Sequence, residues 1–106
     1  MTVHAIDAFL LKHWLDHDEA VLIDVREPDE YQKAHISGSI LIPLATLTQQ
    51  SLPELKERKL VFQCHSGKRS LTACEKISAA IPSLDVYNLQ GGIVAWYEHY
   101  PIEQGV

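Results

Sequence analysis

The sequence has 106 residues, which suits one compact domain over residues 1–106 and leaves no room for a second. Hydrophobic residues make up 46% of the chain, enough to bury a core, and the formal net charge of −5 argues against a nucleic-acid-binding protein. The chain shows no signal peptide, no apolar run near the roughly 18 residues of a membrane span, and too few cysteines for a disulfide scaffold. We therefore expect a cytoplasmic protein with reduced thiols and no membrane or nucleic-acid partner.

Four short apolar runs are predicted to form strands. They lie at residues 20–25, 39–42, 60–63 and 86–89. Their hydrophobicity is continuous instead of alternating, which is typical of strands buried on both faces of a parallel sheet. Helical patterns lie between the runs, and this alternation predicts an α/β layer fold with right-handed crossovers.

The first two helices are predicted from the residues at their starts. Asp7 is a suitable N-cap for a helix on which Phe9, Leu10 and Trp14 share one face. Proline is tolerated at the first position of a helix, so a second helix is expected to begin at Pro28.

The remaining segments contain shorter and longer helical patterns. Residues 43–57 mix polar residues with scattered leucines and are expected to hold one or two short helical turns. A long helix is predicted over residues 68–81, because Pro82 stops it. Its apolar residues at helical spacing are Leu71, Cys74, Ile77 and Ile81. A last helix is expected between the glycine pair at 91–92 and Pro101. Its packing face is predicted to consist of Ile93, Trp96, Tyr97 and Tyr100.

The stretch FQCHSGKRS at residues 62–70 carries the candidate chemistry. A strand ends just before Cys64, and ligands of open parallel sheets bind beyond the carboxyl ends of the strands. Gly67 provides the freedom for a curl in which successive backbone N–H groups point inward and form a concave anion site. The positive end of the following helix adds to this site. Lys68 and Arg69 add formal charge, although their side chains can also point elsewhere.

This setting is expected to stabilise the thiolate of Cys64. A free cysteine has a pKa of about 8.5. Lowering that pKa by about two units takes about 2.7 kcal/mol of differential interaction, which a helix terminus and several N–H donors can supply. The same donors would hold an anionic substrate or a persulfide. The alternative is that Cys64 is only a small hydrophobic residue buried at a strand end.

The sequence resembles the rhodanese family from about Asp7 to Trp96, in three blocks. The first block is DVREPDEY at 24–31, followed by HISGSI at 35–40 and IP at 42–43. The second is CHSGKRS at 64–70, and the third is LQGGIVAW at 89–96. Each block alone is a weak match, whereas their order and spacing together are specific.

The resemblance implies an α/β fold with an open, mainly parallel five-stranded sheet and helices on both faces. It also implies a ping-pong sulfurtransferase in which Cys64 is the catalytic residue. Its thiolate would take the outer sulfur of a donor such as thiosulfate, become a persulfide, and pass the sulfur to a thiol or cyanide acceptor. No metal or organic cofactor is implied. The residues implied to bind the substrate, through their backbone, are His65, Ser66, Gly67, Lys68, Arg69 and Ser70.

Two other readings of the loop stay open. The chain is alternatively a sulfur carrier or sensor module that receives persulfide sulfur from a protein partner and turns over poorly. Related phosphatases also place a cysteine before an anion-binding loop closed by arginine. Cys64 and Arg69 are separated by four residues, one fewer than in those phosphatases. The shorter loop makes a smaller pocket, which suits a sulfur-containing anion or a persulfide better than a phosphoryl group.

The other polar residues in the matching blocks are expected to be structural. Asp24 is placed to bond with nearby backbone, and Arg26 to pair with Glu30 or another neighbour. His35 is expected to fix a turn by hydrogen bonding. Cys74 falls on the apolar stripe of its helix and is predicted to pack in the core.

The histidines do not predict a metal centre. His65 lies in the loop, where its side chain either shapes the preference for a donor or points to solvent. His4, His13, His17 and His99 show no metal-ligand spacing, so no metal site is expected.

Overall fold

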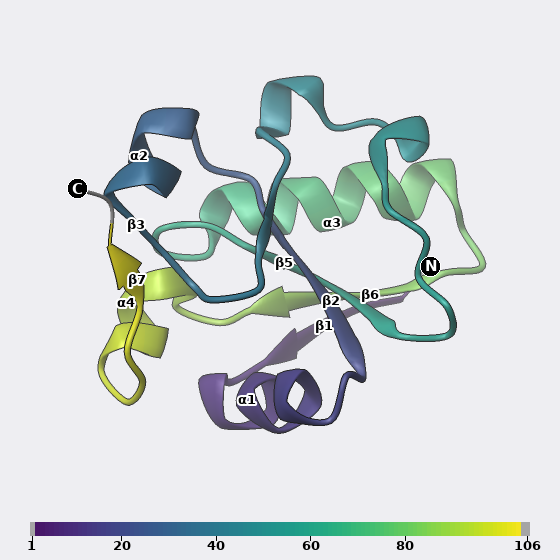
Figure 1. Ribbon diagram of the computed structural model, residues 1–106. Helices are drawn as coiled ribbons and strands as arrows, with labels where there is room; N and C mark the ends of the chain where they lie inside the picture. Colours follow the sequence, from purple (N-terminus) through teal and green to yellow (C-terminus); the bar gives the residue numbers. More distant parts are fainter. Residues whose placement is uncertain (1, 105–106) are drawn as a thin grey trace.

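A five-stranded sheet lies at the centre of the protein, with helices on both of its faces (Figure 1). The computed structural model describes residues 2–104. The elements in chain order are β1 (Thr2–Ile6), α1 (Ala8–Asp16), β2 (Ala20–Asp24), α2 (Pro28–Lys33), β3 (Ala34–His35), β4 (Ile40–Leu41), the 3-10 helices η1 (Leu44–Thr46) and η2 (Gln49–Ser51), β5 (Lys59–Gln63), α3 (Lys68–Ala80), β6 (Asp85–Leu89), α4 (Gly92–Tyr97) and β7 (Glu103–Gln104). The sheet has the order β1-β6-β5-β2-β4 with every pair parallel. This confirms the expected α/β fold.

The four predicted strands are present, and the fifth strand is β1. The apolar runs correspond to β2, β4, β5 and β6, although β4 is only two residues long. The strand β1 lies at the edge of the sheet, beside β6. In this strand His4 is half-buried and Ala5 is exposed, so β1 lacks the continuous hydrophobicity that marks the inner strands.

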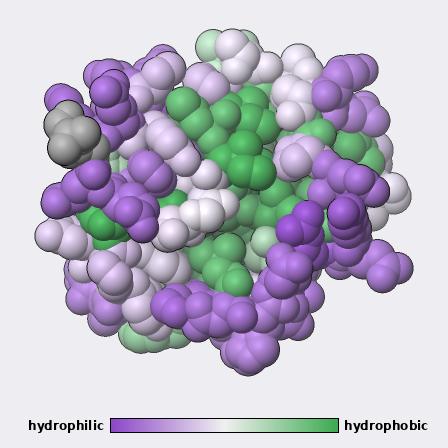
Figure 2. All heavy atoms as spheres, viewed as in Figure 1, coloured by the Kyte–Doolittle hydropathy of each residue, from purple (hydrophilic) through white to green (hydrophobic). Residues whose placement is uncertain are grey.

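Each face of the sheet carries its own hydrophobic core. Strand side chains alternate between the faces. In β2, Leu22 therefore packs with Leu11 of α1 and Trp96 of α4 on one face. Ile23 packs with Ile77 of α3 on the other face. Hydrophobic side chains gather across the middle of the face seen in Figure 2 and are surrounded by hydrophilic ones.

The first helix begins as predicted but buries a different face. The Asp7 carboxylate accepts a hydrogen bond from the Leu10 N–H at 2.8 Å, which confirms the N-cap. Leu11 is fully buried together with Trp14, whereas Phe9 is 55% exposed and Leu10 is 40% exposed. The predicted shared face of Phe9, Leu10 and Trp14 is therefore wrong. Several apolar stripes fit one helix, and contact with the sheet decides which of them is buried.

The same correction applies to the later helices. In α3, Cys74 and Ile77 are buried as predicted, but Leu71 is 43% exposed. In α4, Trp96 is buried whereas Tyr97 is 61% exposed. The helix α4 ends at Tyr97, so Tyr100 lies beyond it, on a segment that leads to β7.

A second, two-stranded sheet was not predicted from the sequence. The strand β3 pairs antiparallel with β7, which places the C-terminal segment beside α2. A pairing over this sequence distance leaves no local pattern, and each strand has only two residues. The 3-10 helices η1 and η2 confirm the short helical turns expected in residues 43–57. Among residues 2–104, no helix has both the length and the apolar character needed to cross a bilayer.

Candidate active site

The sulfur atom of Cys64 lies at the carboxyl end of the central strand. Cys64 directly follows β5 and is 1% exposed. The Gly67 N–H donates a hydrogen bond to Cys64 Sγ at 3.1 Å. The Ser70 hydroxyl oxygen lies 3.4 Å from the same sulfur. The sulfur is therefore buried against polar donors of its own loop and not only against apolar side chains.

Contacts with α4 turn the loop amides toward the sulfur. The Cys64 carbonyl accepts a hydrogen bond from the Ile93 N–H at 2.9 Å, and the His65 carbonyl accepts one from the Val94 N–H at 3.3 Å. The C=O and N–H of a trans peptide point in opposite directions. Because the His65 carbonyl faces α4, the Ser66 N–H of the same peptide faces the opposite side, where the sulfur lies. The start of α4 thus orients the loop.

Glycine at position 92 makes this close contact possible. A Cβ atom on Gly92 would lie 2.4 Å from the Cys64 carbonyl oxygen and 2.5 Å from that of His65. The φ of Gly92 is +60°, in the left-handed region. The loop itself also needs a glycine, because Gly67 has a φ of +107° immediately before α3.

The surroundings of the two cysteines shift their pKa values in opposite directions. Burial raises the pKa of Cys64, but the neighbouring Ser70 hydroxyl and the backbone N–H groups of Ser70, Gly67 and Ser66 outweigh it and lower the pKa below its ordinary value. Burial raises the pKa of Cys74 to about 12, with a smaller contribution from the charge of Glu75. Of the two cysteines, Cys64 is therefore the one whose surroundings favour the thiolate.

We expect the pKa of Cys64 to lie below about 8.5, the value of a free cysteine. Cys74, with its pKa raised to about 12, should remain a thiol over the same pH range. The thiolate is followed by its ultraviolet absorbance across a pH titration, because this readout does not require a reagent to reach the buried sulfur. The Cys64→Ser variant supplies the background. A midpoint for Cys64 at or above the free-cysteine value would contradict the activation described above.

Asn88 supports the loop, and the sequence analysis missed it. The Ser70 hydroxyl donates a hydrogen bond to Asn88 Oδ1, and Asn88 Nδ2 donates one to the Gly67 carbonyl at 3.3 Å. Asn88 lies on β6 and pairs in register with Phe62 of β5, two residues before Cys64. A polar residue near the end of a mostly apolar strand is the signal that could have identified this position.

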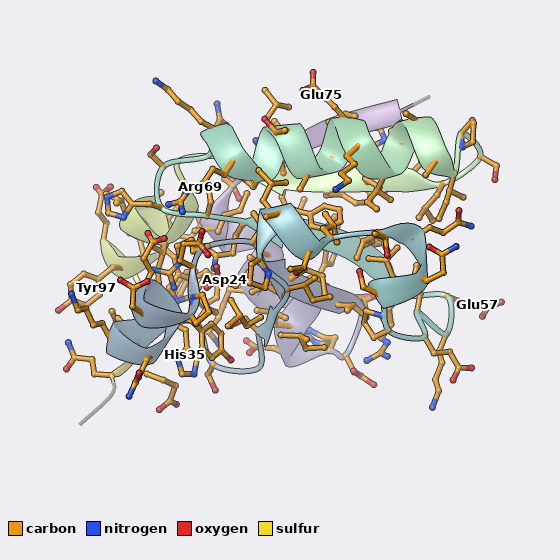
Figure 3. All side chains as sticks on the ribbon, turned by 90° about the horizontal axis from the view of Figure 1, so that it is seen from above. Asp24, His35, Glu57, Arg69, Glu75 and Tyr97 are labelled. Atoms are coloured by element: carbon orange, nitrogen blue, oxygen red, sulfur yellow. The ribbon has the colours of Figure 1, made fainter. Side chains whose placement is uncertain are left out.

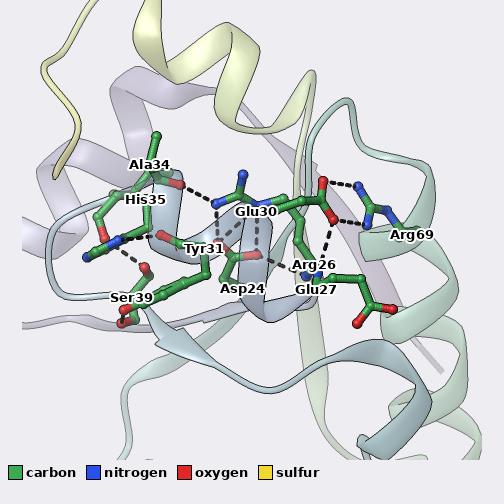
Figure 4. Close-up of polar contacts among 10 residues, drawn as sticks. Asp24, Arg26, Glu27, Glu30, Tyr31, Ala34, His35, Ser39 and Arg69 are labelled. Carbon is green, nitrogen blue, oxygen red and sulfur yellow. Dashed lines mark hydrogen bonds and ion pairs between the residues drawn. The ribbon is translucent and has the colours of Figure 1, made fainter. Parts of the chain in front are cut away.

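The side chains of the remaining predicted loop residues do not gather around the sulfur. His65, Ser66 and Lys68 have exposed side chains. Arg69 forms a bidentate ion pair with Glu30 of α2, with distances of 2.7 and 2.9 Å (Figure 4). The guanidinium that was expected to add charge to the anion site is therefore held by a carboxylate.

The residues expected to be structural make structural contacts. Arg26 pairs with its buried neighbour Asp24 at 2.7 Å and also donates to the Ala34 carbonyl at 2.7 Å (Figure 4). His35 Nδ1 donates to the Tyr31 carbonyl at 2.9 Å, and the two rings stack with centroids 3.9 Å apart. Both groups fix the segment that follows β2.

One group of side chains has the proximity of metal ligands but lies far from Cys64. Ligand atoms of His13, His17 and Glu19 lie within 4.8 Å of one another. The two histidines are one helical turn apart, a spacing that the sequence analysis passed over. They precede β2 and thus lie at the amino ends of the strands, opposite the loop. Surface groups of this kind are common without an ion, and the absence of a metal site stays a prediction.

Comparison with known proteins places the chain in a family. Residues 8–99 match the family model of the rhodanese-like domain. The sulfurtransferase of Allochromatium vinosum is 33% identical over 98 residues, which cover 92% of this chain and 91% of that protein. The crystal structure of a rhodanese-related protein from Thermoplasma volcanium is 31% identical, covers 94% of this chain and 97% of the other, and has a TM-score of 0.80. The chain therefore belongs to the rhodanese-like domain family, and proteins named as sulfurtransferases are among its relatives.

Other relatives are much longer than this chain. The probable adenylyltransferase/sulfurtransferase MoeZ of Mycobacterium tuberculosis is 42% identical over 89 residues, which cover 81% of this chain and 22% of MoeZ. The chain thus corresponds to one part of such a relative. The activity of a whole relative is not transferred to it, and its reaction is argued from the site.

Proposed function

We propose that the protein is a sulfurtransferase that carries sulfur as a persulfide on Cys64. The surroundings of the Cys64 sulfur carry this proposal. The Gly67 N–H donates a hydrogen bond to the sulfur at 3.1 Å, and hydrogen bonds lower the pKa of Cys64 although burial raises it. A thiolate held in this way is a nucleophile at neutral pH. Family membership and the sulfurtransferase from Allochromatium vinosum support the same reaction.

In the first half-reaction, the Cys64 thiolate attacks the outer sulfur of a donor such as thiosulfate. A bond forms between Sγ and that sulfur, and the bond that held it to the donor breaks. The electron pair leaves with the remainder of the donor, which is sulfite when the donor is thiosulfate. Because Cys64 is only 1% exposed, a donor reaches it best through a small terminal sulfur atom.

In the second half-reaction, a thiol or cyanide attacks the outer sulfur of the persulfide and restores the thiolate. The amide donors of Ser66, Gly67 and Ser70 that lower the pKa of Cys64 are placed to stabilise the anionic persulfide as well. The lowered pKa of Cys64 reduces the need for a general base in the first half-reaction. His35 is accordingly not assigned as a base, because its ring hydrogen-bonds to the Tyr31 carbonyl and stacks on the Tyr31 ring.

Incubation with thiosulfate and cyanide tests the proposal. We expect thiocyanate to accumulate, and intact-mass analysis after thiosulfate alone to show one added sulfur atom. If Cys64 gains a sulfur atom only from a protein persulfide and no thiocyanate forms, the protein is a sulfur carrier and not an enzyme that turns over thiosulfate. Failure of every donor to place sulfur on Cys64 would overturn both.

A further inference from the structure

The hydroxyl group of Ser70 lies between the Cys64 sulfur and the Asn88 side chain. Ser70 is fully buried in the first turn of α3. Its oxygen lies 3.4 Å from Cys64 Sγ, and its hydroxyl donates a hydrogen bond to Asn88 Oδ1 on β6. A hydroxyl group has one proton, so it donates fully to only one of these two neighbours at a time. The neighbour that receives the proton decides whether Ser70 is a donor to the sulfur.

The Gly67 carbonyl fixes the orientation of the Asn88 amide. Asn88 Nδ2 donates a hydrogen bond to this carbonyl at 3.3 Å. A carbonyl oxygen only accepts hydrogen bonds, so turning the amide over would place two oxygen atoms against each other. The amide oxygen of Asn88 therefore faces Ser70. Because that oxygen also only accepts, the Ser70 proton points toward Asn88.

This arrangement suits a protonated Cys64 better than an ionised one. With its proton toward Asn88, Ser70 turns the lone pairs of its oxygen toward Sγ. A thiol can donate its S–H to these lone pairs, whereas a thiolate only accepts. When Cys64 ionises, the Ser70 proton has to rotate toward the sulfur. Ser70 therefore helps to lower the pKa of Cys64 only by giving up its hydrogen bond to Asn88.

A sulfur atom added to Cys64 removes this requirement. In the persulfide the negative charge lies on the outer sulfur, and Sγ becomes a neutral sulfur atom with two bonds. Sγ then no longer needs the Ser70 proton, and the hydroxyl can return to Asn88 while the loop amides face the outer charge. The hydrogen bond between Ser70 and Asn88 is thus compatible with the thiol and with the persulfide, but not with full stabilisation of the thiolate.

We propose that Asn88 is a positioning residue that holds the proton of the Ser70 hydroxyl and thereby favours the sulfur-loaded form of Cys64 over the free thiolate. Asn88 acts through Ser70, which contacts both Asn88 and the sulfur. The effect on loading rests on the proposed function. The direction of the Ser70 proton does not, because it follows from the hydrogen bonds alone.

The charged groups on the elements around Cys64 stay in place when only Ser70 and Asn88 are replaced. Arg69 interacts electrostatically with Cys64 and lies at the end of α3 next to the loop, whereas Glu75 lies further along that helix (Figure 3). The helix α4 carries no residue that is charged at neutral pH. The other titratable groups on these elements are Glu30 of α2, Asp24 and Arg26 at the end of β2, His65 and Lys68 of the loop, and Cys74 of α3.

A thiolate titration of Asn88 variants tests the role of the Ser70 proton. Asn88→Ala removes the acceptor, so the Ser70 hydroxyl becomes free to donate to the thiolate. We expect the midpoint for Cys64 to fall by about one pH unit. Asn88→Val removes the same acceptor with a residue that suits a strand, and it should give the same shift. Gln90→Ala is the matched control, because it removes an exposed amide two residues further along the chain.

The same change in a Ser70→Ala background separates the proton from support of the loop. Without the Ser70 hydroxyl, Asn88→Ala should leave the midpoint for Cys64 nearly unchanged. Any shift caused by loss of the hydrogen bond to the Gly67 carbonyl is common to both backgrounds and cancels in the comparison. An equal shift in both backgrounds, or a midpoint that rises more when Ser70 is present, would show that Asn88 does not hold the proton.

Sulfite tests the effect of Asn88 on loading. Attack of sulfite on the outer sulfur of the persulfide forms thiosulfate, breaks the S–S bond to Cys64 and returns the electron pair to Sγ, so the total charge is unchanged. The test is run at a pH at which Cys64 is ionised in every variant. We expect Asn88→Ala to lose half of its sulfur at an about tenfold lower sulfite concentration than the unchanged protein. Intact-mass analysis measures the loaded fraction, and Gln90→Ala should behave as the unchanged protein does.

The outcomes separate the role of Asn88 from the proposed function. If the titrations follow the expectation and no donor loads Cys64, the proposed function fails and the direction of the Ser70 proton stands. If Cys64 is loaded but the shift does not depend on Ser70, the role of Asn88 is wrong and the sulfurtransferase stands. An unchanged sulfite dependence in Asn88→Ala overturns the preference for the loaded form.

Discussion

Replacing Cys64 by serine is expected to abolish sulfur loading and to lower sulfur transfer at least about a thousandfold. A serine hydroxyl does not ionise near neutral pH, so the amide donors around position 64 have no anion to stabilise. The change is nearly isosteric, and the introduced hydroxyl can still accept the Gly67 N–H that Cys64 Sγ accepts now. Intact-mass analysis after incubation with donor and an assay of thiocyanate production measure the two effects.

The second cysteine supplies the control. Cys74 lies on α3, where it is fully buried in the core, and burial raises its pKa to about 12. We expect Cys74→Ala to cost about 1 kcal/mol of unfolding free energy and to leave sulfur loading intact. Loading that persists in Cys64→Ser and disappears in Cys74→Ala would reverse the assignment.

Replacing Gly92 by alanine is expected to lower the unfolding free energy by about 4 kcal/mol or more. The new Cβ would lie 2.4 Å from the carbonyl oxygen of Cys64 and 2.5 Å from that of His65. Both neighbours are backbone atoms, so they cannot move aside as a flexible side chain can. Either α4 or the loop must shift, and the amides that face the Cys64 sulfur shift with it.

Gly38→Ala separates this clash from backbone strain. Gly38 also has a positive φ, of +84°, but a Cβ there would meet no heavy atom of the described residues within 4 Å. Its cost should be limited to the about 1–2 kcal/mol of a left-handed alanine. Urea unfolding measures both variants, and the thiolate titration of Gly92→Ala should show a raised pKa for Cys64. Equal losses of stability with an unchanged titration would refute the role of Gly92.

Much of the site has a local cause and was therefore predictable. Cys64 follows an apolar strand, Gly67 follows three residues later, and a helix begins at Lys68. The position of the sulfur at the carboxyl edge of the sheet follows from that order alone. The Asp7 cap and the helix start at Pro28 are equally local, because a cap is decided by the residues of one helical turn.

Contacts between distant segments were not predictable in the same way. Ser70 meets Asn88 across 18 positions, and Arg69 meets Glu30 across 39. Periodicity also left more than one candidate face on each helix, and Phe9, Leu71 and Tyr97 proved to be exposed. A hydrophobic pattern states that a helix has an apolar stripe, but only the neighbouring elements determine which stripe they cover.

The sequence by itself determined the alternation of strands and helices and the position of the candidate nucleophile and its loop, because short-range patterns and backbone preferences are sufficient for these. The tertiary structure alone decided which carboxylate the positive charge beside the loop pairs with. Arg69 is next to the loop in sequence, yet Glu30 neutralises it from α2. A cavity lined by residues of α2 and α4 likewise includes Ile102, which directly precedes β7 and is brought beside α2 by the pairing of β3 with β7. An ion pair and a cavity depend on distances in space, which spacing along the chain does not specify.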